Sequence, residues 1–177
     1  PCMEQQNYEQ RGYLHEDFRL FHLDEAMNAP VDWHYHTFHK IIAFLSGSAS
    51  YGIEGKSYVL EAGDLILVPS GCIHRPEIAP GAPYERIILY ISPEFLRTAG
   101  TPDCDLEACF TKAQAEFMFV LRPGAERRAL LGALLALERE QPSQAFGKAL
   151  LERALVLQFL IGVRRGMEEN RLEAIRS

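Results

Sequence analysis

The sequence predicts a mainly β fold that ends in helices, and three observations lead to this prediction. Residues 13–91 contain short apolar or alternating runs separated by turn residues, which is typical of an antiparallel barrel or sandwich. After Pro93 the apolar residues recur at helical spacing instead. With 177 residues, the chain is long enough for one such domain with a helical appendage.

The β part is built from runs that have the length and the apolar pattern of strands. Glu54-Gly55 and 62–64 are turn-forming segments, and we expect both to be hairpin connections. The segment 78–85 holds two prolines and a glycine and is expected to be a loop. The expected strands lie within 18–23, 40–47, 49–55, 56–64, 65–71 and 84–92.

The helical part predicts two helices joined by a short turn. Pro123 and Pro142 bracket the first helix, and Ser143 is a suitable N-cap for the second. Residues 154–163 are apolar nearly all round, so the second helix is either buried or lies in an interface. The pair could cover the barrel or form a homodimer interface, and we favour the dimer. One stripe of the second helix consists of Phe146, Leu150, Ala154, Leu157 and Ile161.

Composition excludes some functions for this part of the protein. The net charge of −6 argues against direct binding to nucleic acid, which requires a basic surface. No apolar run is long enough to span a membrane, and no signal peptide is visible. The four cysteines (Cys2, Cys72, Cys104 and Cys109) show no CxxC spacing, which favours reduced thiols in a cytoplasmic protein.

Three histidines are the candidate functional residues. His34 and His36 are two residues apart, so on a strand both side chains would point to the same face, with Trp33 and Tyr35 on the other. His74 follows a turn marked by Pro69 and Gly71. Together the three imidazoles could bind a transition metal, or they could line a pocket for a small molecule.

These motifs resemble those of the cupin superfamily. Its first motif is a histidine pair, an acidic residue and a glycine, and its second motif runs glycine, proline, glycine, histidine. Lys40 stands where the glutamate of the first motif is usual. The matching residues are His34, His36 and Gly47 in the first motif and Gly63, Pro69, Gly71 and His74 in the second.

A longer stretch, FHKIIAFLSGSASYGIEGKSYVLEAGDLILVPSGCIHRPEI with YISPEFL and the two helices, is similar to the N-terminal sensing domain of AraC-type transcription regulators. The resemblance covers about 15–165 and implies a cupin-like jelly-roll barrel that binds a small effector, followed by an antiparallel helix pair that forms a homodimer. It places DNA binding in a helix-turn-helix domain beyond Ser177. The implied divisions are an arm that could respond to ligand or be merely flexible (1–12), the barrel (13–92), the helical dimerisation region (93–166) and a linker (167–177).

Lys40 is the main departure from the cupin pattern. A protonated lysine cannot ligate a metal, but three histidines can still hold zinc, nickel, copper or iron with open positions. If the strand is unbroken, Lys40 shares the face of the histidines; a bulge would instead turn His39 inward. The expected effector-binding residues are His34, His36, Phe38, Lys40, Tyr51 and His74, with Ile53, Arg19 and Glu85 as weaker candidates.

Two other functions remain open from the sequence. The first is a metal-dependent cupin enzyme of the isomerase or dioxygenase type, because three histidines leave coordination positions for a substrate. The second is a dimerisation module with an empty barrel. The sequence contains no nucleophile elbow, paired carboxylates or phosphate-binding glycine loop that would indicate another enzyme class.

Overall fold

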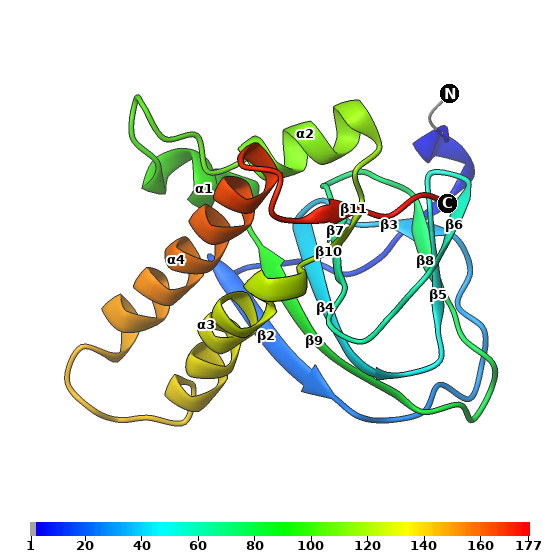
Figure 1. Ribbon diagram of the computed structural model, residues 1–177, viewed down its shortest axis with the longest axis horizontal. Coiled ribbons are helices and arrows are strands. Elements are labelled where there is room, and N and C mark those ends of the chain that lie inside the picture. The colour runs from blue at the N-terminus through cyan, green and yellow to red at the C-terminus, as the bar shows by residue number, and fades with distance from the viewer. Residues whose placement is uncertain (1–2) are drawn as a thin grey trace.

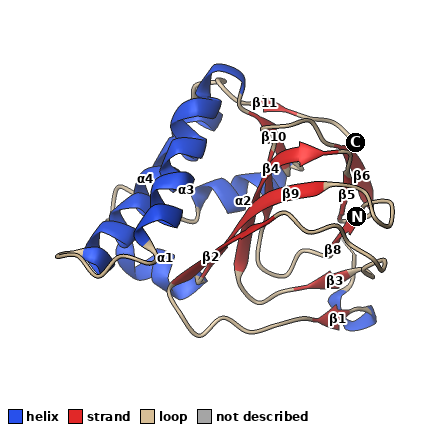
Figure 2. Cartoon of the chain, turned by 90° about the horizontal axis from the view of Figure 1, so that it is seen from below, coloured by secondary structure: helices blue, strands red, loops and turns tan. Residues whose placement is uncertain are grey.

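The computed structural model describes residues 3–177. The first two residues of the expected arm, Pro1 and Cys2, lie outside the described part. Two sheets face each other to form a barrel, and helices α3 and α4 lie side by side on one flank of it (Figures 1 and 2). Neighbouring strands are antiparallel, except for the parallel pair β1 and β3. The predicted fold class is confirmed.

The strands form two sheets, and four helices and two short 3-10 turns complete the described part of the fold. The first sheet has the order β1 (Glu9–Gln10), β3 (His34–Tyr35), β8 (His74–Glu77), β5 (Ser50–Ile53) and β6 (Lys56–Val59). The second has the order β11 (Glu173–Ala174), β10 (Val120–Arg122), β7 (Leu65–Val68), β4 (His39–Gly47), β9 (Tyr84–Ile91) and β2 (Phe18–Leu23). The helices are α1 (Pro93–Ala99), α2 (Ala108–Glu116), α3 (Arg127–Glu140) and α4 (Lys148–Glu168), with short 3-10 turns η1 (Gln5–Asn7) and η2 (Gly124–Glu126).

The two expected hairpin connections have different outcomes. Glu54 and Gly55 both have positive φ, 50° and 81°, and they connect the paired strands β5 and β6 as a tight hairpin requires. The second expectation was wrong: residues 62–64 lead from β6 in one sheet to β7 in the other. The local turn signal is the same in both places, but only long-range pairing decides which strands become neighbours.

Three short strands lie outside the expected β region. β10 lies within 93–166 and pairs with β7, while β11 lies within the expected linker and pairs with β10. β1 lies in the expected arm and pairs with β3. Each has only two or three residues, too few for a period of two to be recognised in the sequence.

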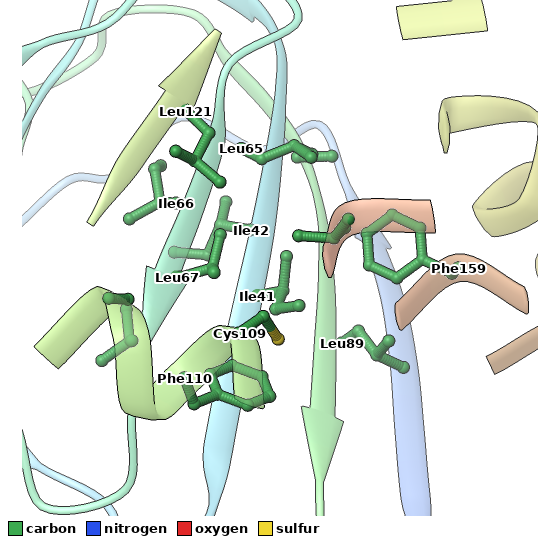
Figure 3. Packing of buried hydrophobic residues seen from close by; sticks show 14 of the residues in the cluster. Ile41, Ile42, Leu65, Ile66, Leu67, Leu89, Cys109, Phe110, Leu121 and Phe159 are labelled. Atoms are coloured by element: carbon green, nitrogen blue, oxygen red, sulfur yellow. The ribbon is translucent and has the colours of Figure 1, made fainter. Parts of the chain in front are cut away.

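Both faces of β4 are buried, because one face lines the barrel and helices cover the other. Lys40 and Ile42 line the barrel cavity, whereas the ring of His39 stacks on Phe110 of α2 at 4.1 Å. Figure 3 shows Phe110 and Cys109 of α2 beside the strands, with Phe159 of α4 next to them. Apolar burial on two faces therefore accounts for the nearly continuous apolar run of this strand.

The predicted helix pair is present, but α4 starts and faces differently from the expectation. Ser143 does not cap it; the helix begins at Lys148 after Gly147, whose φ is 78°. Phe146 and Leu150 of the predicted stripe are exposed. The face that packs against the rest of the molecule consists of Val156, Phe159, Leu160, Val163 and Met167.

An ion pair with a fully buried carboxylate joins the residue before β7 to the neighbouring strand β10. Asp64 is fully buried and accepts hydrogen bonds from Arg122 Nε at 2.9 Å and Nη2 at 3.0 Å, and from the Glu61 backbone N–H at 2.7 Å. Arg122→Met would leave this carboxylate buried without its cation. We expect the free energy of unfolding to fall by about 3 kcal/mol in urea denaturation. The exposed Arg128→Met should change it by less than about 0.5 kcal/mol, and an equal loss in both variants would contradict this role for Asp64.

Candidate metal centre and cavity

The three predicted histidines meet inside the barrel. His34 belongs to β3 and pairs in register with His74, the first residue of β8, while His36 follows directly after β3. All three are buried, and each offers a ring nitrogen such that the three atoms lie within 4.8 Å of one another. The structure therefore brings together residues from two distant stretches of sequence.

The turn before His74 explains how the second motif reaches the first. Gly71 has a φ of 87°, a left-handed conformation that favours glycine, and its N–H donates to the His36 carbonyl at 2.8 Å. Cys72 N–H donates to the Pro69 carbonyl at 3.1 Å and closes the turn. The proline and glycine of the motif thus hold the turn against the strand end that carries His36.

Backbone carbonyls orient all three imidazoles in the same way. In each ring the Nδ1 atom donates to a backbone carbonyl. His34 donates to Asp32 at 2.8 Å, His36 to Arg11 at 2.6 Å and His74 to Cys72 at 2.9 Å. The Nε2 atoms then carry lone pairs, and those of His36 and His74 are buried with no hydrogen-bond partner among residues 3–177. A set of buried, unprotonated Nε2 atoms with second-sphere hydrogen bonds fits a divalent transition metal.

The electrostatic environment keeps these rings neutral, the form that ligates metals. Burial, assisted by the charge of Lys40, lowers the pKa of His36 to about 3. The same two causes lower the pKa of His74 well below 6.5, and burial also lowers that of His34. At neutral pH no proton has to leave these rings before a metal can bind.

Phe38, Lys40 and Tyr51 lie with His34 and His36 around one cavity of about 330 Å³. The strand is not unbroken, since β3 ends at Tyr35 and β4 begins at His39, yet the alternation of side chains persists across the bend. Lys40 points inward, and its Nζ donates to the Tyr51 hydroxyl at 3.2 Å. The alternative arrangement, with His39 turned inward, is not seen, because Lys40 and not His39 lines the cavity.

His39 and Trp33 lie outside the cavity. His39 Nδ1 accepts from the Ser70 N–H at 2.9 Å, and its Nε2 lies 2.8 Å from Glu107. Trp33 contacts Gly52 and Arg75 instead, with the guanidinium 4.5 Å from its ring centre. Both side chains therefore belong to the packing around the barrel.

Several cavity residues were missed in the sequence, and three weaker candidates lie outside the lining of this cavity. Tyr84, Arg86, Ile88 and Tyr90 line the cavity, and the alternation in YERIILYI could have revealed their common face. Arg11, Gly12 and Tyr13 of the N-terminal segment also line it, which no local signal indicates. Ile53, Arg19 and Glu85 do not; Glu85 has the opposite alternation and binds His22.

The family model of the AraC-like ligand binding domain matches residues 20–160. The chain belongs to this family. The comparison of this chain with curated protein sequences found no match. In the described residues no helix is both long and apolar enough to cross a membrane.

Solved structures similar to the AraC-like domain include cupin-fold proteins. A cupin-like protein from Thermotoga maritima has 21% identity and a TM-score of 0.39, covering 45% of this chain and 60% of its own. A Cupin 2 conserved barrel domain protein from Salinispora arenicola has 16% identity and a TM-score of 0.40, covering 48% and 71%. A putative mannose-6-phosphate isomerase from Ralstonia eutropha has 22% identity and a TM-score of 0.38, covering 45% and 79%.

His22 connects the barrel of the AraC-like domain to α3. Its ring lies 2.8 Å from Glu85 of β9 and 2.7 Å from Glu138 of α3. Burial lowers the pKa of His22, but the hydrogen bonds to the two carboxylates outweigh it, so the pKa lies above 6.5. The protonated ring therefore stabilises the fold fully below the unfolded-state pKa, and this contribution is lost as pH rises through the folded-state pKa.

At low pH the variant His22→Gln should have a smaller free energy of unfolding than the native protein. The difference between the two should shrink as pH rises through the folded-state pKa. Urea unfolding at a series of pH values measures the difference, and an NMR titration of the ring gives the pKa directly. A folded-state pKa below 6.5 would contradict the proposed bridge.

Proposed function

We propose that this chain is the effector-sensing and dimerisation domain of an AraC-type transcription regulator, and that the effector binds inside the barrel beside a three-histidine metal site. The observation that carries the proposal is a cavity lined by His34 and His36, next to which the buried Nε2 atoms of His36 and His74 have no partner among the described residues. Buried polar atoms without partners are costly, and a ligand in the cavity would satisfy them.

The metal would be zinc, nickel or iron, held by His34, His36 and His74. Bound there, it would offer open positions to an oxygen atom of the effector. Isothermal titration of chelator-treated protein with each metal tests the site, and thermal shifts with a metabolite panel test the sensor function. A protein that binds neither metal nor any small molecule would be a dimerisation module with an empty barrel.

The N-terminal segment supports a route from the cavity to the rest of the regulator. The Arg11 carbonyl orients His36, while Gly12 and Tyr13 line the cavity. An effector that contacts this segment would favour one of its arrangements over another, which is a shift in population. DNA binding is assigned to a separate helix-turn-helix domain, consistent with the net charge of −6 here.

The proposed homodimer uses the exposed face of α4. Leu150 is 72% exposed and Leu151 46%, while Leu157 and Ile161 on the same side are half-buried; Phe146, in the turn just before α4, is 106% exposed. Large apolar side chains that follow one helix face mark an interaction surface. A second copy of this chain is the partner we assign to it, because the family resemblance places the dimer contact on these helices.

Leu150→Glu should convert the dimer to a monomer in sedimentation velocity, because it places a charge in the apolar contact. Leu150 is exposed in the monomer, so the variant should fold normally by circular dichroism. Val59→Glu, at a 73% exposed site on β6 away from the helices, is the matched control and should remain dimeric. A monomeric native protein would exclude the dimer.

A metal-dependent cupin enzyme is the alternative function. It is favoured by the same three nitrogen ligands, which leave coordination positions open to a substrate. Elemental analysis followed by turnover assays on small organic substrates distinguishes the two. Metal with no turnover agrees with a sensor, whereas sustained turnover would replace the sensor with an enzyme.

A further inference from the structure

We propose that the effector is a small organic anion, a carboxylate attached to a flat apolar body, and that its carboxylate accepts a hydrogen bond from Arg86 with Lys40 as the second positive charge. The inference rests on the proposed function in one respect, that the barrel cavity is the effector site. It adds the chemical class of the ligand, argued from residues other than the three histidines.

The cavity contains two buried cations and no anion. Lys40 of β4 is 7% exposed and Arg86 of β9 is 8% exposed, and both line the cavity. No Asp or Glu side chain is among the described lining residues, and no ion pair within residues 3–177 includes either cation. Burial of an unpaired charge costs several kcal/mol, so such a cavity favours an anionic ligand.

Arg86 keeps a buried donor that has no partner among the described residues. Its Nη1 donates to the backbone carbonyls of Glu25 at 2.9 Å and Tyr84 at 2.8 Å, and its guanidinium lies 4.2 Å from the Tyr84 ring centre. These contacts hold the side chain in place. Its Nε is buried and has no partner, so a preoriented charged donor remains for a ligand.

Lys40 has a neutral hydrogen-bond partner, and its pKa is lowered. Its Nζ has the neutral Tyr51 hydroxyl as a partner at 3.2 Å. Burial, together with the positive charge of Arg86, lowers the pKa of Lys40 to about 7. Two buried cationic side chains therefore face one cavity with no carboxylate among its described lining residues, which favours an anionic ligand.

The remaining walls determine the body of the ligand. Phe38 and Tyr90 are in ring contact, with 4.6 Å between their ring centres. Ile42 and Ile88 add aliphatic surface beside these rings. A flat or aromatic body fits such walls, and about 330 Å³ lies at the small end of small-molecule sites.

The test compares charged ligands with neutral ligands of the same shape. Thermal shift and isothermal titration would use benzoate, 4-hydroxybenzoate, phenylacetate and cinnamate, each beside its primary amide, together with inorganic phosphate and neutral sugars. We expect at least one carboxylate to bind and to raise the melting temperature, with its amide and inorganic phosphate without effect.

Variants of the two cations then test whether Lys40 and Arg86 bind the carboxylate. Lys40→Met and Arg86→Met should each weaken binding of that carboxylate by roughly 30-fold or more, since each removes a buried charge partner. Arg75→Met removes a cation that stacks on Trp33 outside the cavity and should leave binding unchanged. Lys40→Met should also melt no lower than the native protein without ligand, because it removes an unpaired buried charge.

The outcomes separate the two proposals. Binding of a sugar or an amide that the two variants do not weaken would overturn the anionic ligand while leaving the barrel as an effector site. A Lys40→Met protein that melts well below the native protein would show that Lys40 is structural and would overturn the inference as well. Failure of every compound to bind would overturn both proposals.

Discussion

His74→Phe is expected to lower the affinity for divalent transition metals by more than about 100-fold, which exceeds the loss usual for an outer-sphere partner. His74 is fully buried and presents its Nε2 to the other two histidines. Phenylalanine has a ring of similar size but no lone pair. It can keep the stacked contact with Tyr51, so the barrel should survive while the ligand is lost.

The measurement is competition with a chromogenic chelator for zinc, nickel or cobalt. Circular dichroism shows whether the fold is retained. His15→Gln removes an exposed histidine outside the cluster and should bind metal as the native protein does. Unchanged affinity in His74→Phe would show that the metal binds elsewhere, whereas loss in both variants would indicate adventitious binding by histidines.

Phe159→Ala is expected to lower the free energy of unfolding by about 4 kcal/mol. Phe159 is 1% exposed and lies on the inner face of α4, where it joins the cluster that includes Leu89 and Ile41 (Figure 3). Removing the ring would leave a cavity between the helix and the sheet. Because α4 carries the proposed dimer surface on its other face, a loosened helix should also weaken dimerisation.

Urea denaturation with paired circular dichroism and fluorescence measures the change. Phe146→Ala is the matched control, since it removes the same ring from an exposed site in the turn just before α4. At low protein concentration, where association contributes least, it should change stability by less than about 0.5 kcal/mol. A loss equal to that of Phe159→Ala would contradict the assignment of the inner and outer faces.

Much of the fold was predictable because local patterns reflect burial directly. Alternating residues marked 18–23 and 84–92, which became β2 and β9. Leucines at helical spacing between two prolines marked α3. The strands β10 and β11 were not predictable, because two or three residues carry no period and their pairing partners lie far away in the sequence.

Some features of the candidate site were also predictable from local sequence, and others were not. The side-chain parity of His34, His36, Phe38 and Lys40 follows from the spacing of residues along an extended chain, and the tight turn before His74 follows from Pro69 and Gly71. The tertiary structure decided the rest. The pairing of β3 with β8 brings His74 to His34, and the Arg11 carbonyl selects the tautomer of His36. Arg86 lines the same cavity as Lys40, and no carboxylate is among the described lining residues. These features depend on contacts between distant segments, and a residue's own neighbours in the sequence carry no information about them.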